Sequence, residues 1–108
     1  MNTSATPIPL ACNPNALSAA EWSAHQATST RLFRELRVSS EELPDGYVFH
    51  FPAGAFALVA AFVEVERRCC PFLTFGVDVL PGATAIILRI TGSPEAREII
   101  AAELPISQ

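Results

Sequence analysis

Two adjacent cysteines and a glutamate one helical turn before them are the residues of this chain whose types and spacing could do chemistry. Glu66 precedes Cys69 by three residues and Cys70 by four, and Pro71 follows. Residues three and four apart lie on the same face of a helix, so the three side chains can meet over one patch. A thiol can bind a metal, act as a nucleophile or form a disulfide, and a carboxylate can bind a metal or move a proton.

Helical periodicity predicts that the Glu66 side chain points toward the interior. At about 100° per residue, the apolar side chains of this segment fall on one side of a helix and the charged ones on the other, and Glu66 falls among the apolar ones. The apolar side holds Leu58, Val59, Phe62 and Val65, and the charged side holds Glu64, Arg67 and Arg68. A buried carboxylate is costly unless it is paired, protonated or bound to a cation.

Several kinds of thiol chemistry remain open for the cysteine pair. Neighbouring α-carbons lie about 3.8 Å apart, whereas disulfides favour roughly 4.4–6.8 Å, so a bridge between Cys69 and Cys70 is disfavoured. A disulfide from Cys12 to either of them is sterically possible and would serve as a redox switch rather than as a permanent structural cross-link. A nucleophile is possible but not favoured, because the negative end of the helix and Glu66 both oppose a thiolate.

The same negative groups favour a cation, and we therefore predict a metal site with sulfur, nitrogen and oxygen ligands. The candidate ligands are Cys69, Cys70, Glu66, Cys12 from the N-terminal arm and His25 from the first helix. Zinc is the abundant choice, and thiophilic ions such as copper(I) or mercury(II) suit paired cysteines at least as well. A vicinal pair is not the usual spacing of zinc ligands.

Structural roles compete with this interpretation. Free cysteines are among the most buried residue types, so Cys69 and Cys70 could simply be packed under Phe72 and Phe75. A histidine on the inner face of a helix is more often hydrogen-bonded to backbone at the edge of a core than bound to a metal. The structural interpretation leaves Glu66 unexplained unless it pairs with an arginine or the helix rotates enough to expose it.

The composition excludes several classes of function. The chain has 108 residues, 50% hydrophobic and 17% charged, which is typical of one compact domain and not of a disordered segment. Seven arginines and no lysine stand against eleven acids, for a net charge of −4, so no basic face for nucleic acid or anionic membrane is expected. No nucleotide, flavin or haem signature is present.

The cellular setting is predicted from the cysteines and the chain's N-terminal residues. Three cysteines are an odd number, which favours thiol or metal chemistry over a disulfide framework. Residues 1–9 lack the features of a signal peptide, and the apolar stretch 55–63 is too short to span a bilayer, so we expect a cytoplasmic protein. The expected partner is a metal ion or a small molecule, and the apolar composition makes a homodimer plausible.

The hydrophobic pattern predicts an extended arm over residues 1–15, with a short strand at 8–11, followed by one α+β domain over residues 16–108. The predicted elements are helices over 19–35, from 55 to the residue before Pro71 and from Pro94, and strands over 36–43, 47–51, 73–79 and 86–90. An antiparallel sheet of about four strands with helices on one face buries the apolar faces of all of these elements. Helix starts and turns recur every 36–39 residues or so, which hints at a duplicated helix-hairpin unit, α-β-β-α-β-β-α.

A family resemblance covers most of the chain from Cys12 onward. The segments that carry it are Glu66-Arg67-Arg68-Cys69-Cys70-Pro71-Phe72-Leu73, Leu43-Pro44-Asp45-Gly46-Tyr47 and Ile90-Thr91-Gly92. They resemble a family of small uncharacterised bacterial proteins with a Glu-x-x-Cys-Cys-Pro-Phe signature. The resemblance includes a cysteine ahead of the first helix and a histidine within it, matched by Cys12 and His25. It adds weight to the five candidate ligands and implies no substrate.

Three functions are therefore open. We predict a small protein with a thiol and carboxylate site that binds a soft or borderline metal ion, for binding, sensing or detoxification. An alternative is a thiol-dependent redox or transferase-type enzyme in which Cys69 or Cys70 reacts and Glu66 moves the proton. A third is a ligand-free interaction module with structural cysteines. Its contact surface would consist of Phe72, Leu73 and Phe75.

Overall fold

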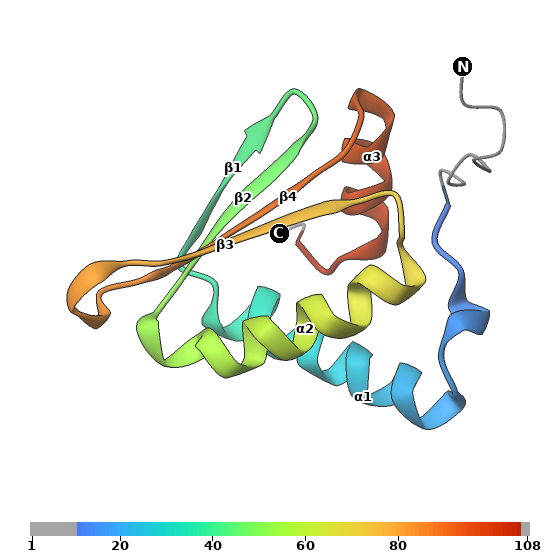
Figure 1. The fold of residues 1–108 in the computed structure, drawn as a ribbon, viewed down its shortest axis with the longest axis horizontal. Helices are drawn as coiled ribbons and strands as arrows, with labels where there is room; N and C mark the ends of the chain where they lie inside the picture. The colour runs from blue at the N-terminus through green and yellow to red at the C-terminus, as the bar shows by residue number, and fades with distance from the viewer. Residues whose placement is uncertain (1–10, 107–108) are drawn as a thin grey trace, which may run out of the picture.

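The computed structural model describes residues 11–106, and within them it contains three α-helices and one four-stranded antiparallel sheet (Figure 1). The helices are α1 (Ala19–Thr30), α2 (Phe56–Cys69) and α3 (Pro94–Glu103). The strands are β1 (Ser39–Leu43), β2 (Gly46–Phe51), β3 (Thr74–Val79) and β4 (Ile86–Thr91). The predicted α+β class and element order are confirmed. Most of the strand predicted at residues 8–11 lies outside the described residues, and Ala11 is in a bend.

The sheet has the strand order β1-β2-β4-β3, so the second strands of the two hairpins pair at its centre. Gly46 is opposite Thr91 in this central pair, and Phe51 is opposite Ile86. Each helix-hairpin unit therefore contributes one half of the sheet, and the two halves meet in antiparallel fashion.

Helices α2 and α3, together with residues 31–36 that follow α1, contribute to one core on a single face of the sheet. Alternate residues of the two central strands point into this core. They are Phe49, Phe51, Ile86, Leu88 and Ile90. From the helical side, Phe33 packs edge to face against Phe49, Phe51 and Phe62. Val79, which continues the apolar alternation of β3, is 60% exposed, because it lies at the end of an edge strand.

Helix α1 begins at the predicted capping box. The Ser18 hydroxyl accepts a hydrogen bond from the Glu21 backbone N–H, and the Glu21 carboxylate accepts one from the Ser18 backbone N–H. The helix continues into a π-helical segment, Arg31–Leu36, so the helical region predicted over 19–35 extends one residue into the strand expected over 36–43. The strand therefore starts at Ser39. His25 and Ser29 are buried on the inner side of α1.

Helix α2 follows a 3-10 turn at Ala53–Ala55 and ends at Cys69, with Cys70 as its C-cap and Pro71 next. Its buried stripe consists of Val59, Phe62, Glu66 and Cys69. Glu66 is only 4% exposed, so the predicted inward orientation of this carboxylate is confirmed. Within residues 11–106, every helix falls short of the length and apolarity that crossing a bilayer would require.

Candidate functional site

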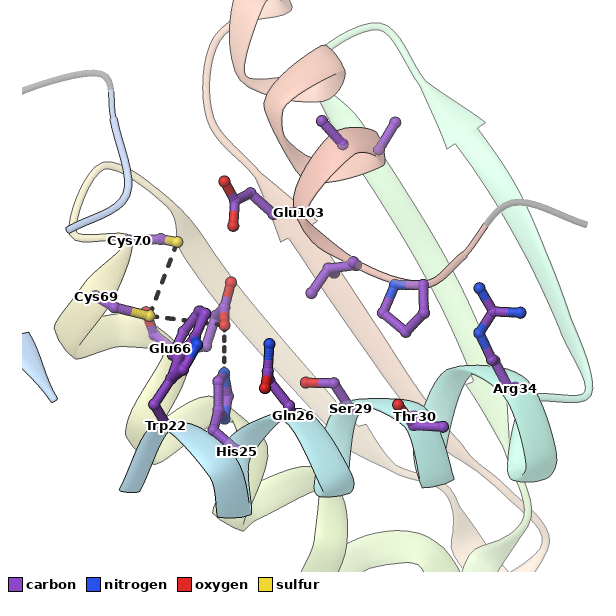
Figure 2. Close-up of a pocket in the computed structure, with 14 residues that line it drawn as sticks. Trp22, His25, Gln26, Ser29, Thr30, Arg34, Glu66, Cys69, Cys70 and Glu103 are labelled. Atoms are coloured by element: carbon purple, nitrogen blue, oxygen red, sulfur yellow. Dashed lines mark hydrogen bonds and ion pairs between the residues drawn. The ribbon is translucent and has the colours of Figure 1, made fainter. Parts of the chain in front are cut away.

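The buried carboxylate of Glu66 on α2 is paired with His25 on α1 (Figure 2). His25 Nε2 lies 2.6 Å from Glu66 Oε1, and the histidine is 5% exposed. A short hydrogen bond of this kind compensates for the loss of water around the carboxylate. Glu66 therefore has a partner in the interior, and that partner is the histidine rather than an arginine.

Aromatic side chains fix the His25 ring. The ring stacks on Phe62 with centroids 5.3 Å apart, and it lies 6.3 Å from the ring of Trp22. Its second nitrogen, Nδ1, is buried and has no hydrogen-bond partner among the described residues. A buried, unpaired polar atom is uncommon in proteins and marks this histidine as unusual for a purely structural residue.

Cys69 lies next to this pair. Its Sγ is 3.9 Å from Glu66 Oε1 and 4.0 Å from the Sγ of Cys70. Burial, followed by the negative charge of the Glu66 carboxylate, raises the pKa of the Cys69 thiol to about 11. Without a nearby cation, Cys69 is a neutral thiol at pH 7. The expectation that a thiolate is disfavoured here is confirmed, with burial as the leading cause.

Cys70 is joined to Cys12 in a disulfide, and Cys69 is a free buried thiol. This is the Cys12 bridge that the sequence left open, and it connects residues 58 positions apart. The expectation of thiols rather than a disulfide is therefore wrong for Cys12 and Cys70 in this form of the protein. Neither can be a thiolate ligand until the bridge is reduced, so the structure brings together His25, Glu66 and Cys69 as available ligands.

Contacts other than the disulfide also hold the segment before α1 against the end of α2. The Asn13 backbone N–H donates to the Cys69 carbonyl, and Leu17 packs in a buried cluster with Cys69 and Cys70. On the outside, the Arg68 guanidinium donates to the Glu21 carboxylate at 3.0 Å. This hydrogen bond is the leading cause that lowers the pKa of Glu21 to about 2.

A cavity of about 640 Å³ opens beside the site, between α1 and the end of α3 (Figure 2). Gln26, Ser29 and Thr30 line it from α1, and Glu103 lines it from α3. The negative charge of Glu103 contributes to the raised pKa of Cys69. The end of the cavity near the sulfur atoms therefore favours a cation.

The ligand atoms of His25, Glu66 and Cys69 all lie within 4.8 Å of one another. In a tetrahedral zinc site, bonds of about 2.0–2.3 Å place the ligand atoms roughly 3.3–3.7 Å apart. The distance of 2.6 Å from His25 Nε2 to Glu66 Oε1 would have to widen by less than about 1 Å, and the distance of 3.9 Å from Cys69 Sγ to Glu66 Oε1 would have to shorten by a few tenths of an ångström. Rotation of side chains is sufficient for such changes.

Two features of the site were not predicted from the sequence. His25 and Glu66 were expected in one ligand set, but their direct hydrogen bond was not predicted, nor was the wall formed by α3. A histidine and an acid on the buried faces of adjacent helices are a signal for such a pair. Phe72, Leu73 and Phe75 are half-buried and pack against the core clusters, so the contact surface expected of an interaction module is partly covered.

Comparisons of the chain with models of protein families, with curated proteins and with solved structures found no match. The family resemblance based on the Glu-x-x-Cys-Cys-Pro-Phe signature stays a prediction.

Proposed function

We propose that this protein binds a borderline or soft metal ion, with zinc as the first candidate, through His25, Glu66 and Cys69. The observation that carries the proposal is the convergence of one nitrogen, one oxygen and one sulfur ligand atom, all buried and within 4.8 Å of one another. Imidazole, carboxylate and thiolate are the ligand types of protein zinc sites. A cation would also offset the buried negative charge of Glu66 and favour the thiolate of Cys69.

The surrounding charges support a cation. Glu103 lies on the opposite wall of the cavity, and the carbonyl groups at the end of α2 add partial negative charge near Cys69. Arg68, the arginine next to Cys69 in sequence, donates to Glu21 and to the Ala16 carbonyl on the exposed side. Its guanidinium therefore does not compete with a metal ion for Glu66.

Three protein ligands leave a fourth position of a tetrahedral ion open, and the cavity can supply water or a small molecule there. Tightly bound zinc histidines usually donate their second N–H to an acceptor, and His25 Nδ1 has none among the described residues. We therefore expect an affinity below that of closed structural zinc sites. This arrangement fits exchange or sensing of a metal better than permanent storage.

The test is a zinc titration of the oxidised, chelator-treated protein in competition with a chromogenic chelator. We expect one zinc ion per chain and at least a tenfold loss of affinity in Glu66→Gln, which removes a charged ligand and keeps a hydrogen-bonding group near His25. The matched control is Glu64→Gln on the same helix, because the Glu64 carboxylate is exposed. Equal affinities in wild type and Glu66→Gln would show that the site is assigned incorrectly.

A thiol-disulfide redox protein is the second candidate. The observation that favours it is the free Cys69 thiol 4.0 Å from Cys70, whose sulfur is part of a disulfide. Attack by the Cys69 thiolate on the sulfur of Cys70 would create a disulfide between neighbouring residues, which disulfide geometry disfavours. This candidate also needs a thiolate, so slow alkylation of Cys69 at neutral pH would count against it.

A further inference from the structure

We propose that reduction of the Cys12–Cys70 disulfide creates a second ligand set at the same place, made of the thiols of Cys12, Cys69 and Cys70. This set binds a thiophilic ion that takes three sulfur ligands, with trivalent arsenic as the probe. The inference rests on the proposed function because Cys69 belongs to both ligand sets. The redox state of the bridge then decides which class of ion the protein accepts.

The positions of the three sulfur atoms support a three-coordinate site. Cys70 Sγ is bonded to the sulfur of Cys12 and lies 4.0 Å from the sulfur of Cys69. With bonds of about 2.3 Å to sulfur and the pyramidal angles of trivalent arsenic, about 95–100°, the three sulfur atoms lie roughly 3.4–3.5 Å apart. The sulfur atoms of Cys69 and Cys70, 4.0 Å apart, have to approach by about 0.5 Å, and Cys12 has only to move away from bonding distance.

Cys12 is held near the other two cysteines by contacts that do not need the disulfide. The Asn13 N–H donates to the Cys69 carbonyl, and Leu17 is buried against Cys69 and Cys70. The Arg68 guanidinium contacts the Ala16 carbonyl at 3.4 Å. After reduction, these contacts keep the Cys12 thiol beside the pair, so little ordering is required when the ion binds.

The number and type of ligands select the ion. Reduction by a phosphine or a dithiol adds two electrons and two protons to the bridge and gives two thiols, while the phosphine becomes its oxide or the dithiol its disulfide. Arsenous acid then forms three arsenic-sulfur bonds, and its three hydroxyl groups leave as water with the thiol protons. Sulfur ligands favour soft ions, whereas the oxidised set of nitrogen, oxygen and one sulfur favours zinc.

The Cys12–Cys70 bridge borders the cavity beside α1. Cys70 lines this cavity but is only 1% exposed, whereas Cys12 is half-buried, so a reductant meets the bridge first at Cys12. Figure 2 shows the Cys70 sulfur above Cys69 and on the side of Glu103. The bridge is therefore placed where a small reductant can act without unfolding of the core.

The experiment compares oxidised and phosphine-reduced protein, freed of reductant, for binding of arsenite and of phenylarsine oxide, which needs only two thiols. Bound arsenic is measured by elemental analysis after gel filtration. We expect reduced wild type to bind one arsenite per chain and oxidised protein to bind at least tenfold more weakly. Reduced Cys12→Ser should lose arsenite affinity at least tenfold and keep phenylarsine oxide binding, which shows that its Cys69 and Cys70 pair is intact.

Equal arsenite affinity in reduced wild type and reduced Cys12→Ser would overturn the three-thiol site, and so would equal affinity in the oxidised and reduced wild type. If Cys12→Ser does not fold, Cys69→Ser is measured instead, with the same expected loss of arsenite. Glu66→Gln separates the two proposals, with zinc binding measured on its oxidised form and arsenite binding on its reduced form. Retained arsenite binding with lost zinc binding supports both proposals, whereas a wild type that binds arsenite but no zinc contradicts only the proposed function.

Discussion

At the residue scale, Cys69 is a thiol whose surroundings keep it protonated. It is 2% exposed, and burial followed by the Glu66 charge raises its pKa to about 11. We predict that iodoacetamide alkylates Cys69 of the metal-free, oxidised protein slowly at pH 7 and about tenfold faster per pH unit up to pH 9, because only the thiolate reacts. Mass spectrometry of the time course measures these rates, since Cys12 and Cys70 are blocked by their disulfide.

Urea-unfolded protein is the control for this alkylation, because its Cys69 has neither burial nor a fixed carboxylate nearby. Its rate at pH 7 should exceed that of the folded protein by at least tenfold. A folded protein that reacts as fast as the unfolded one would mean that Cys69 is accessible and its pKa is not raised, and a folded protein that reacts faster would mean that Cys69 is an activated thiol. That result would favour the redox candidate over the metal site.

The orientation of single residues could be predicted where one helix decides it. The periodicity of α2 was sufficient to predict that Glu66 points inward, and its side chain is 4% exposed. The hydrogen bond to His25 could not be derived in the same way, because His25 and Glu66 are 41 positions apart and their contact depends on how two helices pack together. The sequence also could not decide between Cys69 and Cys70 as the partner of Cys12, since that depends on the path of the segment before α1.

At the scale of elements, one exposed ion pair connects the start of α1 with the end of α2. Arg68 contacts both carboxylate oxygens of Glu21, at 3.0 and 3.3 Å, and the same carboxylate completes the capping box. The pKa of Glu21 falls from 4.5 to about 2, first through the Arg68 hydrogen bond and then through the Ser18 backbone N–H. This lowered pKa stabilises the fold fully above pH 4.5, and the stabilisation is lost as the pH falls from there to about 2.

We therefore predict that Glu21→Gln lowers stability near pH 7 and reduces its dependence on pH below pH 4.5. Urea midpoints at pH 7, 4.5 and 3 measure the effect. Arg68→Gln should reduce the acid dependence in the same direction, because Glu21 then loses its main partner. An unchanged acid profile in both variants would show that the pair does not connect the two helices in solution.

Most element boundaries could be predicted because local chemistry sets them. Three helix ends lie where the sequence predicted them. They are marked by the capping box at Ser18, by Pro71 after α2 and by the N-cap Ser93. The π-helical segment Arg31–Leu36 was not predictable. Its residues Leu32 and Phe33 are buried in the core, and such tertiary packing is not contained in local periodicity.

At the scale of the whole molecule, the site lies on the helical side of the sheet and is formed by parts from both ends of the chain. His25 and Cys12 come from the N-terminal region, Glu66 and Cys69 from α2, and the opposite wall of the cavity from the end of α3. The sheet could be predicted from the alternation of apolar and polar residues alone, whereas the convergence of these three regions around one site could not. The disulfide is the covalent link between these regions, so it bears on the stability of the whole fold.

We predict that Cys12→Ser lowers the free energy of unfolding by roughly 4 kcal/mol, because the bridge closes a loop between residues 58 positions apart and such a loop restricts the unfolded chain. Urea denaturation of oxidised wild type and of Cys12→Ser measures the difference. A phosphine reductant should bring wild type to within about 1 kcal/mol of Cys12→Ser and leave the variant unchanged, since only wild type has a bridge to lose. If wild type and variant unfold at the same urea concentration without reductant, the bridge does not form in solution, and the redox control of metal choice is lost with it.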